Sequence, residues 1–293
     1  MTLRERLRRL RLHWNSRALF RDCLADPALA WRLPFSPPGG SVEVRFNSGR
    51  RMVLPAKHWP LLALACRLDR IGAEFEFQDD AKRILLDGLT FYSPLWTRNE
   101  AAYLKEVLID DVYEAKGRDL RGRIVVDVGA YVGDATLAFA RGGAIVHAVE
   151  PSAIFCGFIQ RNAAANGLAG NVVVHAVGLA ERDALQVTDT DTLRFAEGVG
   201  YTCRSLPAAV DILKLDCEGA EYHLLGDPRF LGHLAPGEIR MEYHRGSEPL
   251  LPALERAGYA VELAPSRGPV GLLKARRRAA VGAAGHGRGV CQT

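Results

Sequence analysis

One carboxylate, Asp127, and two glycines, Gly129 and Gly133, lie at spacings typical of a cofactor-binding turn in the stretch DVGAYVGD, residues 127–134, which begins at the end of the apolar run RIVVDV. Gly129 permits a tight turn with positive φ, and Gly133 lets the following helix approach the strand closely. In a dinucleotide fold with the spacing GxGxxG, a middle glycine brings the backbone against a pyrophosphate. Here the spacing is GxxxG and Tyr131 occupies that place. The turn therefore disfavours NAD.

The acids around this turn suit a cofactor that carries an ammonium group and a ribose. Asp127 precedes the turn, where a carboxylate can bind an ammonium, and Glu150 ends the next predicted strand, 23 residues further on. An ionised carboxylate at that place can accept from both ribose hydroxyls. The alternative is that Glu150 only caps the helix that starts near Ser152. S-adenosylmethionine has an α-ammonium and no pyrophosphate, so it is the favoured cofactor. The predicted cofactor contacts are Asp127, Gly129, Ala130, Tyr131, Gly133, Glu150 and Pro151.

More acids, with one histidine, follow two later strands. Asp216 ends the run DILKLD and Glu218 lies on the turn after it, whereas Glu242 and His244 end the run MEYH. Methyl transfer from a sulfonium requires aligned partners and, for a hydroxyl acceptor, a base or a metal near its proton. Because neighbouring strand tips meet, we expect His244 or Asp216 to act as the base. The alternative is that Asp216 and Glu242 bind a divalent cation.

Lys214 is the unusual residue within DILKLD, because it shares a strand face with Asp216 and is expected to be buried. We expect it to pair with an acid such as Glu218 or Glu242, in a salt bridge that fixes the strand rather than in direct catalysis. Glu221 is expected to face away along the next helix and to matter less than Glu218. The predicted catalytic group is Asp216, His244, Glu218, Glu242 and Lys214.

Alternating strands and helices must position these residues. From Arg123 onward, short β-branched runs alternate with helical stretches at 134–141, 153–166, 219–226 and 248–257. This alternation is typical of an α/β fold whose mostly parallel sheet has helices on both faces and binds ligands beyond the carboxyl ends of its strands. The runs YAVELA and PVGLLKA predict a C-terminal antiparallel hairpin.

The first 109 residues have a different pattern, which predicts an α+β extension. A breaker cluster at 34–41 separates a basic amphipathic helix at 2–13 from two hairpins and from helices at 57–72 and 99–109. The basic helix is expected to pack its leucines on the body, with attachment to a membrane surface or a partner as the alternative. The predicted domains are 1–109, a cofactor-binding domain at 110–275, and a basic, disordered tail at 276–293.

Composition excludes several classes of function. Of the 293 residues, 48% are hydrophobic and 25% are charged, which is typical of globular proteins. The longest uncharged apolar run, residues 60–66, is far shorter than the roughly 20 residues of a membrane span. The net charge of +4 comes from basic ends, so the 261 residues between 13 and 273 carry −5, which argues against a nucleic-acid partner. Six scattered cysteines predict neither disulfides nor zinc, and favour the cytoplasm.

With these motifs placed, the sequence resembles the FkbM family of S-adenosylmethionine-dependent methyltransferases. The resemblance covers roughly residues 110–262. It is carried by DVGAYVGDAT, Val149-Glu150-Pro151, Asn162, Asn166 and DILKLDCEGAEY. It implies a Rossmann-like, class I methyltransferase sheet and methyl transfer, usually to oxygen, on a small-molecule or glycosyl acceptor. The family pattern usually has asparagine where this chain has Tyr131.

Two other functions remain open at this point. One is methylation of RNA with the basic termini as anchors, although the turn after the fourth strand lacks the Pro-Pro-aromatic sequence that stacks a flipped base. The other is a cofactor-binding interaction module whose first 100 residues recruit a partner and whose transferase site is relict. The substitution at Tyr131 is the feature that favours the relict module.

Overall fold

The computed structural model describes residue 11 and residues 14–37, 39–266 and 268–279. The predicted basic helix at 2–13 and the predicted tail fall largely outside these residues. Among the described helices, none has the length and apolar character needed to cross a bilayer.

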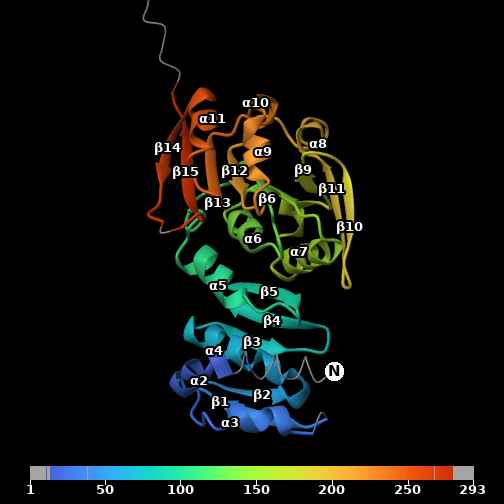
Figure 1. Ribbon diagram of the computed structural model, residues 1–293, viewed down its shortest axis with the longest axis vertical. Helices are drawn as coiled ribbons and strands as arrows, with labels where there is room; N and C mark the ends of the chain where they lie inside the picture. Colours follow the sequence, from blue (N-terminus) through green and yellow to red (C-terminus); the bar gives the residue numbers. More distant parts are fainter. Residues whose placement is uncertain (1–10, 12–13, 38, 267, 280–293) are drawn as a thin grey trace, which may run out of the picture.

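A seven-stranded sheet occupies the C-terminal half, in the order β14-β15-β13-β12-β6-β7-β8 (Figure 1). Its strands are β6 (Ile124–Val128), β7 (Ile145–Val149), β8 (Val172–His175), β12 (Ile212–Leu215), β13 (Glu238–Tyr243), β14 (Tyr259–Leu263) and β15 (Gly271–Arg277). Neighbouring strands are parallel except at β15, which is antiparallel to both β13 and β14. The predicted α/β class and mostly parallel sheet are therefore confirmed. The C-terminal hairpin inserts its second strand between its first strand and β13.

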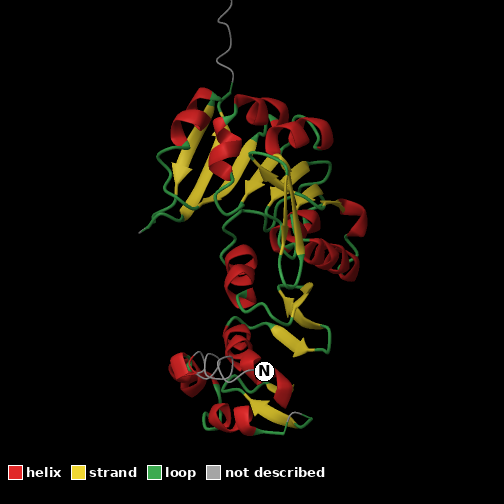
Figure 2. Ribbon diagram, turned by 45° about the vertical axis from the view of Figure 1, so that its right-hand side comes forward, coloured by secondary structure: helices red, strands yellow, loops and turns green. Residues whose placement is uncertain are grey.

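Helices cover both faces of this sheet (Figure 2). They are α6 (Asp134–Arg141), α7 (Ala153–Ala165), α8 (Gly198–Ser205), α9 (Glu221–Gly226), α10 (Pro228–Leu234) and α11 (Leu251–Arg256). Successive residues of the central strand point to opposite faces, as a pleated strand requires. Val125 packs in one core with residues of α6, whereas Val126 packs in a second core with residues of α10. Burial on both faces explains the nearly continuous apolar runs of β6 and β12.

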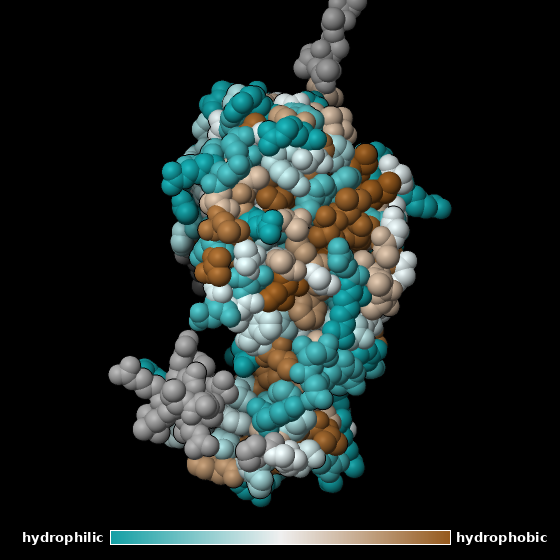
Figure 3. Space-filling view, turned by 90° about the vertical axis from the view of Figure 1, so that its right-hand side faces the viewer, coloured by the Kyte–Doolittle hydropathy of each residue, from teal (hydrophilic) through white to brown (hydrophobic). Residues whose placement is uncertain are grey.

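The chain between β8 and β12 forms a second, three-stranded sheet that the sequence did not predict. Its strands, in the order β10-β11-β9, are β9 (Gly178–Ala180), β10 (Ala184–Val187) and β11 (Thr192–Glu197). All four residues of β10 are exposed, including the apolar Leu185 and Val187. Figure 3 views the side of the molecule on which β10 lies and shows apolar and polar side chains intermixed there.

The N-terminal elements form the lower part of the molecule in Figure 1. Their strands are β1 (Ser41–Arg45), β2 (Arg51–Pro55), β3 (Glu74–Phe77), β4 (Ala81–Leu86) and β5 (Leu89–Pro94). Their helical segments are α2 (Arg17–Cys23), α3 (Leu29–Arg32), η1 (Leu33–Phe35), η2 (Ala56–Leu61), α4 (Leu62–Arg70), α5 (Glu100–Leu104) and the π-helical turn η3 (Lys105–Ile109). The two predicted hairpins are present. β5 extends the second hairpin to three strands, although no strand was predicted there.

Asn162 of α7 and Asn166, the residue just after that helix, join the C-terminal half of the chain to the edge of β5. Asn162 accepts from the backbone N–H of Tyr92 at 2.6 Å and donates to the Tyr92 carbonyl at 3.0 Å. Asn166 makes the same pair of bonds with Thr90, at 2.8 and 2.7 Å. The amides thus act as one more strand and satisfy backbone groups that an open edge would leave unpaired. Because Asn162 also donates to the Val132 carbonyl at 2.8 Å, β5 is tied to the glycine turn.

Candidate active site

A cavity of about 840 Å³ opens beyond the carboxyl ends of β6, β7 and β12. β6 and β12 are neighbours in the sheet, although β7 and β8 lie between them in the chain, so the cavity occupies the point where the strand order reverses. Its volume is within the range of about 300–1,000 Å³ typical of small-molecule sites. Its walls come from the glycine turn, from β9 and β11, and from residues 99–113 of the N-terminal part.

The glycine turn depends on backbone conformations that glycine adopts without strain. Gly129 has φ +80°, and a Cβ added there would lie 1.7 Å from the carbonyl oxygen of Asp216. Gly133, which precedes α6, has φ +90°. Tyr131 adopts φ +50°, an unusual value for a side chain of its size. The turn is therefore held against the end of β12 by a contact that leaves no room for a side chain at residue 129.

Glu150 lies on the cavity wall with its carboxylate held by two backbone amides. One oxygen accepts from the N–H of Tyr131 and the other from the N–H of Ser152, both at 2.9 Å. The cap of α7 is Ser152 itself, whose hydroxyl accepts from the N–H of Phe155 at 3.1 Å, so Glu150 is not needed as the helix cap. Burial raises the pKa of Glu150 to about 7. Each carboxylate oxygen retains a lone pair for a ligand.

Asp127 does not reach the cavity, which overturns its predicted contact with an ammonium group. It is fully buried; its Oδ2 accepts from the Thr136 hydroxyl at 2.6 Å and its Oδ1 lies 3.0 Å from the Lys214 ammonium. The predicted partners of Lys214, Glu218 and Glu242, are also wrong. The register of β12 on β6 places Lys214 directly beside Asp127, which the order of residues along one strand cannot show.

Lys214 fastens the glycine turn to the sheet. Its ammonium donates to the Gly129 carbonyl at 2.8 Å and lies 5.4 Å from the centre of the Tyr113 ring. Burial acts to lower the pKa of Lys214, but the neighbouring acids, Asp127 first, raise it well above its ordinary value. Of the seven predicted cofactor contacts, Gly129, Tyr131, Glu150 and Pro151 line the cavity. Asp127, Ala130 and Gly133 lie behind the wall, where they shape the turn.

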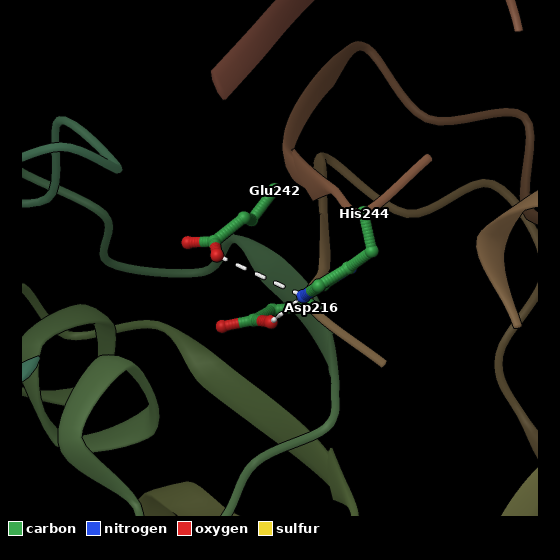
Figure 4. Close-up of side chains that lie close together, drawn as sticks. All are labelled: Asp216, Glu242 and His244. Atoms are coloured by element: carbon green, nitrogen blue, oxygen red, sulfur yellow. Dashed lines mark ion pairs between the residues drawn. The ribbon is translucent and has the colours of Figure 1, made fainter. Parts of the chain in front are cut away.

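Three predicted catalytic side chains converge at one end of the site (Figure 4). One ligand atom from each of Asp216, Glu242 and His244 lies within 4.8 Å of the others. His244 Nε2 is 3.6 Å from Asp216 Oδ1 and 3.7 Å from Glu242 Oε1. The second oxygen of Asp216, Oδ2, accepts from the Tyr113 hydroxyl at 3.1 Å, which leaves Oδ1 facing the imidazole.

Glu221 holds His244 in place, contrary to the expectation that it faces away. It is fully buried, its Oε1 accepts from the backbone N–H of His244 at 3.1 Å, and the same oxygen lies 3.0 Å from His244 Nδ1. The side chain of Glu218 is 91% exposed and lines the cavity, whereas Glu221 lies behind it. Positive φ values at Glu218 and Gly219 reverse the chain, so that the first residue of α9 points at the end of β13. In the sequence, the acid Glu221 shortly after Gly219, at the start of a predicted helix, is the feature that could have indicated this role.

The end of the cavity near Asp216 is acidic. Burial, followed by the repulsion of Asp216, raises the pKa of Glu242 to about 7, and burial also raises the pKa of Glu106. Asp134 is a cavity residue that the sequence reasoning missed, and burial raises its pKa to about 7. Further wall residues come from the N-terminal part, where no motif marked them. They are Asn99, Tyr103, Glu106, Val107, Val112 and Tyr113.

One comparison with known proteins, that with family models, agrees with the resemblance. Residues 127–261 match the family model of the methyltransferase FkbM domain. No curated protein sequence matches the chain. Among solved structures, the methyltransferase FkbM of Methylobacillus flagellatus is similar at 20% identity and a TM-score of 0.41, over 53% of this chain and 43% of that one. TYW2 of M. jannaschii is similar at 15% identity and a TM-score of 0.44, over 69% of this chain and 89% of that one. A SAM-dependent O-methyltransferase of Thermotoga maritima is similar at 13% identity and a TM-score of 0.45, over 84% of this chain and 96% of that one.

Proposed function

We propose that the protein, whose residues 127–261 match the family model of the methyltransferase FkbM domain, methylates a hydroxyl of a neutral small-molecule or glycosyl acceptor with S-adenosylmethionine as donor. The observation that carries the proposal is the Glu150 carboxylate, fixed on the cavity wall by the amides of Tyr131 and Ser152. Its position at the end of the second parallel strand is where ribose hydroxyls bind in folds of this kind.

The cavity offers a group for each part of this donor. Glu150 accepts from the ribose hydroxyls, and Leu179, Leu193 and Phe195 line an apolar surface for the adenine ring. Asp134 faces the cavity beside the glycine turn and takes the ammonium group, the role first predicted for Asp127. When bound, the donor supplies a methyl group on a positively charged sulfur. The rest of the reaction depends on how the chain holds and activates the acceptor.

The acceptor occupies the acidic end of the cavity. In-line displacement at the methyl carbon needs the acceptor oxygen aligned and stripped of its proton. Asp216 and Glu218 lie on the cavity wall at this end, and His244 and Glu242 lie next to Asp216 but outside the residues that line the cavity. Carboxylates repel phosphates and carboxylates in a partly buried site, so a neutral hydroxylated acceptor fits better than RNA.

The cellular location that we propose is the cytoplasm. The five cysteines that the structure describes, Cys23, Cys66, Cys156, Cys203 and Cys217, are all free. Free thiols persist in reducing compartments, whereas secreted proteins usually pair them.

Methyl-labelled S-adenosylmethionine tests the proposal directly. The purified chain is incubated with pools of neutral sugars and polyols, with matched pools of sugar phosphates and uronic acids, and with RNA. We expect label in a neutral pool together with S-adenosylhomocysteine, and none with Glu150→Ala. Label found in RNA or only in the anionic pools contradicts the proposed acceptor class.

A further inference from the structure

The side chains of Asp216, Glu242 and His244 are here called the DEH cluster. Their spacing is too wide for direct hydrogen bonds and close to that of ligands around one metal ion. The distances from His244 Nε2 to the two carboxylate oxygens, 3.6 and 3.7 Å, are longer than a hydrogen bond. Two ligand atoms that each lie about 2.1 Å from one ion, at angles of 90–120°, are about 3.0–3.6 Å apart. The two distances from His244 Nε2 are therefore close to the separation expected around a single cation, and the two carboxylate oxygens lie within 4.8 Å of each other.

Glu221 fixes which nitrogen of the imidazole faces the cluster. Because a carboxylate oxygen only accepts, Nδ1 carries the proton that Glu221 binds at 3.0 Å, and Nε2 turns toward Asp216 and Glu242. A histidine whose second nitrogen donates to a buried carboxylate is the usual arrangement of a metal-ligating histidine. It sets the ring orientation and raises the basicity of the ligating nitrogen.

The charges around the DEH cluster also favour a cation. Glu218 Oε2 lies 3.7 Å from His244 Nε2. The Lys214 ammonium is 4.0 Å from Asp216 Oδ2, the oxygen that faces away from the imidazole, and it is already paired with Asp127 at 3.0 Å. Tyr113 donates to that same far oxygen. Asp216 thus keeps Oδ1 for the cluster while its other oxygen is satisfied by the protein.

We propose that Asp216 Oδ1, Glu242 Oε1 and His244 Nε2 bind one divalent cation with octahedral preference, Mn²⁺ or a metal like it. Two carboxylates and one imidazole suit Mn²⁺ better than Mg²⁺, which takes oxygen ligands, and one of the three ligands, Asp216, also lines the cavity in which we propose that the acceptor binds. Its catalytic role rests on the proposed function, whereas the binding itself does not.

The cation would act on the acceptor as a Lewis acid. A coordinated hydroxyl has a lower pKa, so its O–H bond breaks and the proton passes to the exposed Glu218 carboxylate and on to solvent. The new O–CH3 bond forms with the lone pair of the oxygen as the S–CH3 bond breaks, and the electron pair of that bond remains on sulfur. The products are a methyl ether, S-adenosylhomocysteine and one proton.

Titration with MnCl2, followed by electron paramagnetic resonance of free Mn²⁺, tests the site on the full-length, chelator-treated protein. We expect one bound Mn²⁺ per chain, a loss of binding in Asp216→Asn and His244→Ala, and an affinity about 10–100-fold weaker in Glu221→Gln. Glu248→Gln, at an exposed acid just beyond the same strand, is the matched control and should bind as the wild type does. Mg²⁺ is expected to compete only weakly.

Calorimetry with S-adenosylhomocysteine on the same samples separates the two proposals. Variants that retain this binding are folded, so their loss of Mn²⁺ reports the DEH cluster alone; if Asp216→Asn does not fold, Glu242→Gln replaces it. The cation site is overturned if the wild-type protein does not lower the signal of free Mn²⁺. It is also overturned if Asp216→Asn and Glu248→Gln bind Mn²⁺ equally well. Failure to bind S-adenosylhomocysteine while Mn²⁺ still binds instead overturns the proposed function.

Discussion

Substitution of Gly129 by alanine should both destabilise the protein and weaken its binding of S-adenosylhomocysteine. The added Cβ would lie 1.7 Å from the carbonyl oxygen of Asp216 and 2.7 Å from its carbonyl carbon, both rigid backbone atoms. The left-handed conformation, φ +80°, adds about 1 kcal/mol for alanine. Displacing the turn from β12 adds about 1–3 kcal/mol, as overpacking does elsewhere. We expect the free energy of unfolding to fall by about 2–4 kcal/mol.

The assay is thermal and urea unfolding of Gly129→Ala beside Gly157→Ala. Gly157 lies in α7 with nothing within 4 Å of an added Cβ, so that alanine should be neutral or stabilise the helix by up to about 1 kcal/mol. For a chain of this size, the loss at Gly129 corresponds to a Tm lower by roughly 5–15 °C. The contact between turn and strand would be refuted if Gly129→Ala unfolded like Gly157→Ala and bound S-adenosylhomocysteine normally.

Three further predictions concern groups around the same turn. Because the pKa of Glu150 is raised to about 7, its carboxylate ionises between pH 6 and 8, and affinity for S-adenosylhomocysteine should rise roughly tenfold over that range. In Glu150→Gln, calorimetry should show an affinity for S-adenosylhomocysteine that depends less on pH, and Asp134 accounts for the dependence that remains. The same pH dependence in Glu150→Gln as in the wild type contradicts the ribose contact. Lys214→Met leaves the buried Asp127 without its ion-pair partner and should lower the free energy of unfolding in urea by about 3–5 kcal/mol. The double variant Lys214→Met/Asp127→Asn should recover most of this loss. A double variant as unstable as Lys214→Met contradicts the pairing. Asn162→Ala removes three hydrogen bonds and should cost about 2–4 kcal/mol, with faster hydrogen exchange at the edge of β5; unchanged exchange there contradicts the proposed joint.

The sequence predicted the features that local patterns encode. The alternation of β-branched runs and helical stretches gave the parallel sheet, and the acid before Pro151 placed Glu150 at the edge of the cavity. Strand ends that are neighbours in a sheet meet, which is why Asp216 and Glu242 were expected together. Each of these inferences uses spacing along one segment or one rule about how segments meet.

The features that were missed depend on register and on turns. Lys214 pairs with Asp127 because of the register between β12 and β6, and the sequence of neither strand alone determines that register. Glu221 points at His244 because two residues with positive φ reverse the chain before α9, one of them the non-glycine Glu218. β10 spans only four residues, so the alternation of Leu185, Gln186 and Val187 is too short to identify a strand by itself.

Calorimetric titration of the full-length protein with S-adenosylhomocysteine tests most directly whether the crevice beyond β6 and β7 is a methyl-donor site. The wild type should bind one equivalent with saturable heat, and Glu150→Ala should reduce that heat to baseline while unfolding at nearly the same temperature as the wild type. No binding to the folded wild type, or equal binding by both proteins, would contradict the central claim.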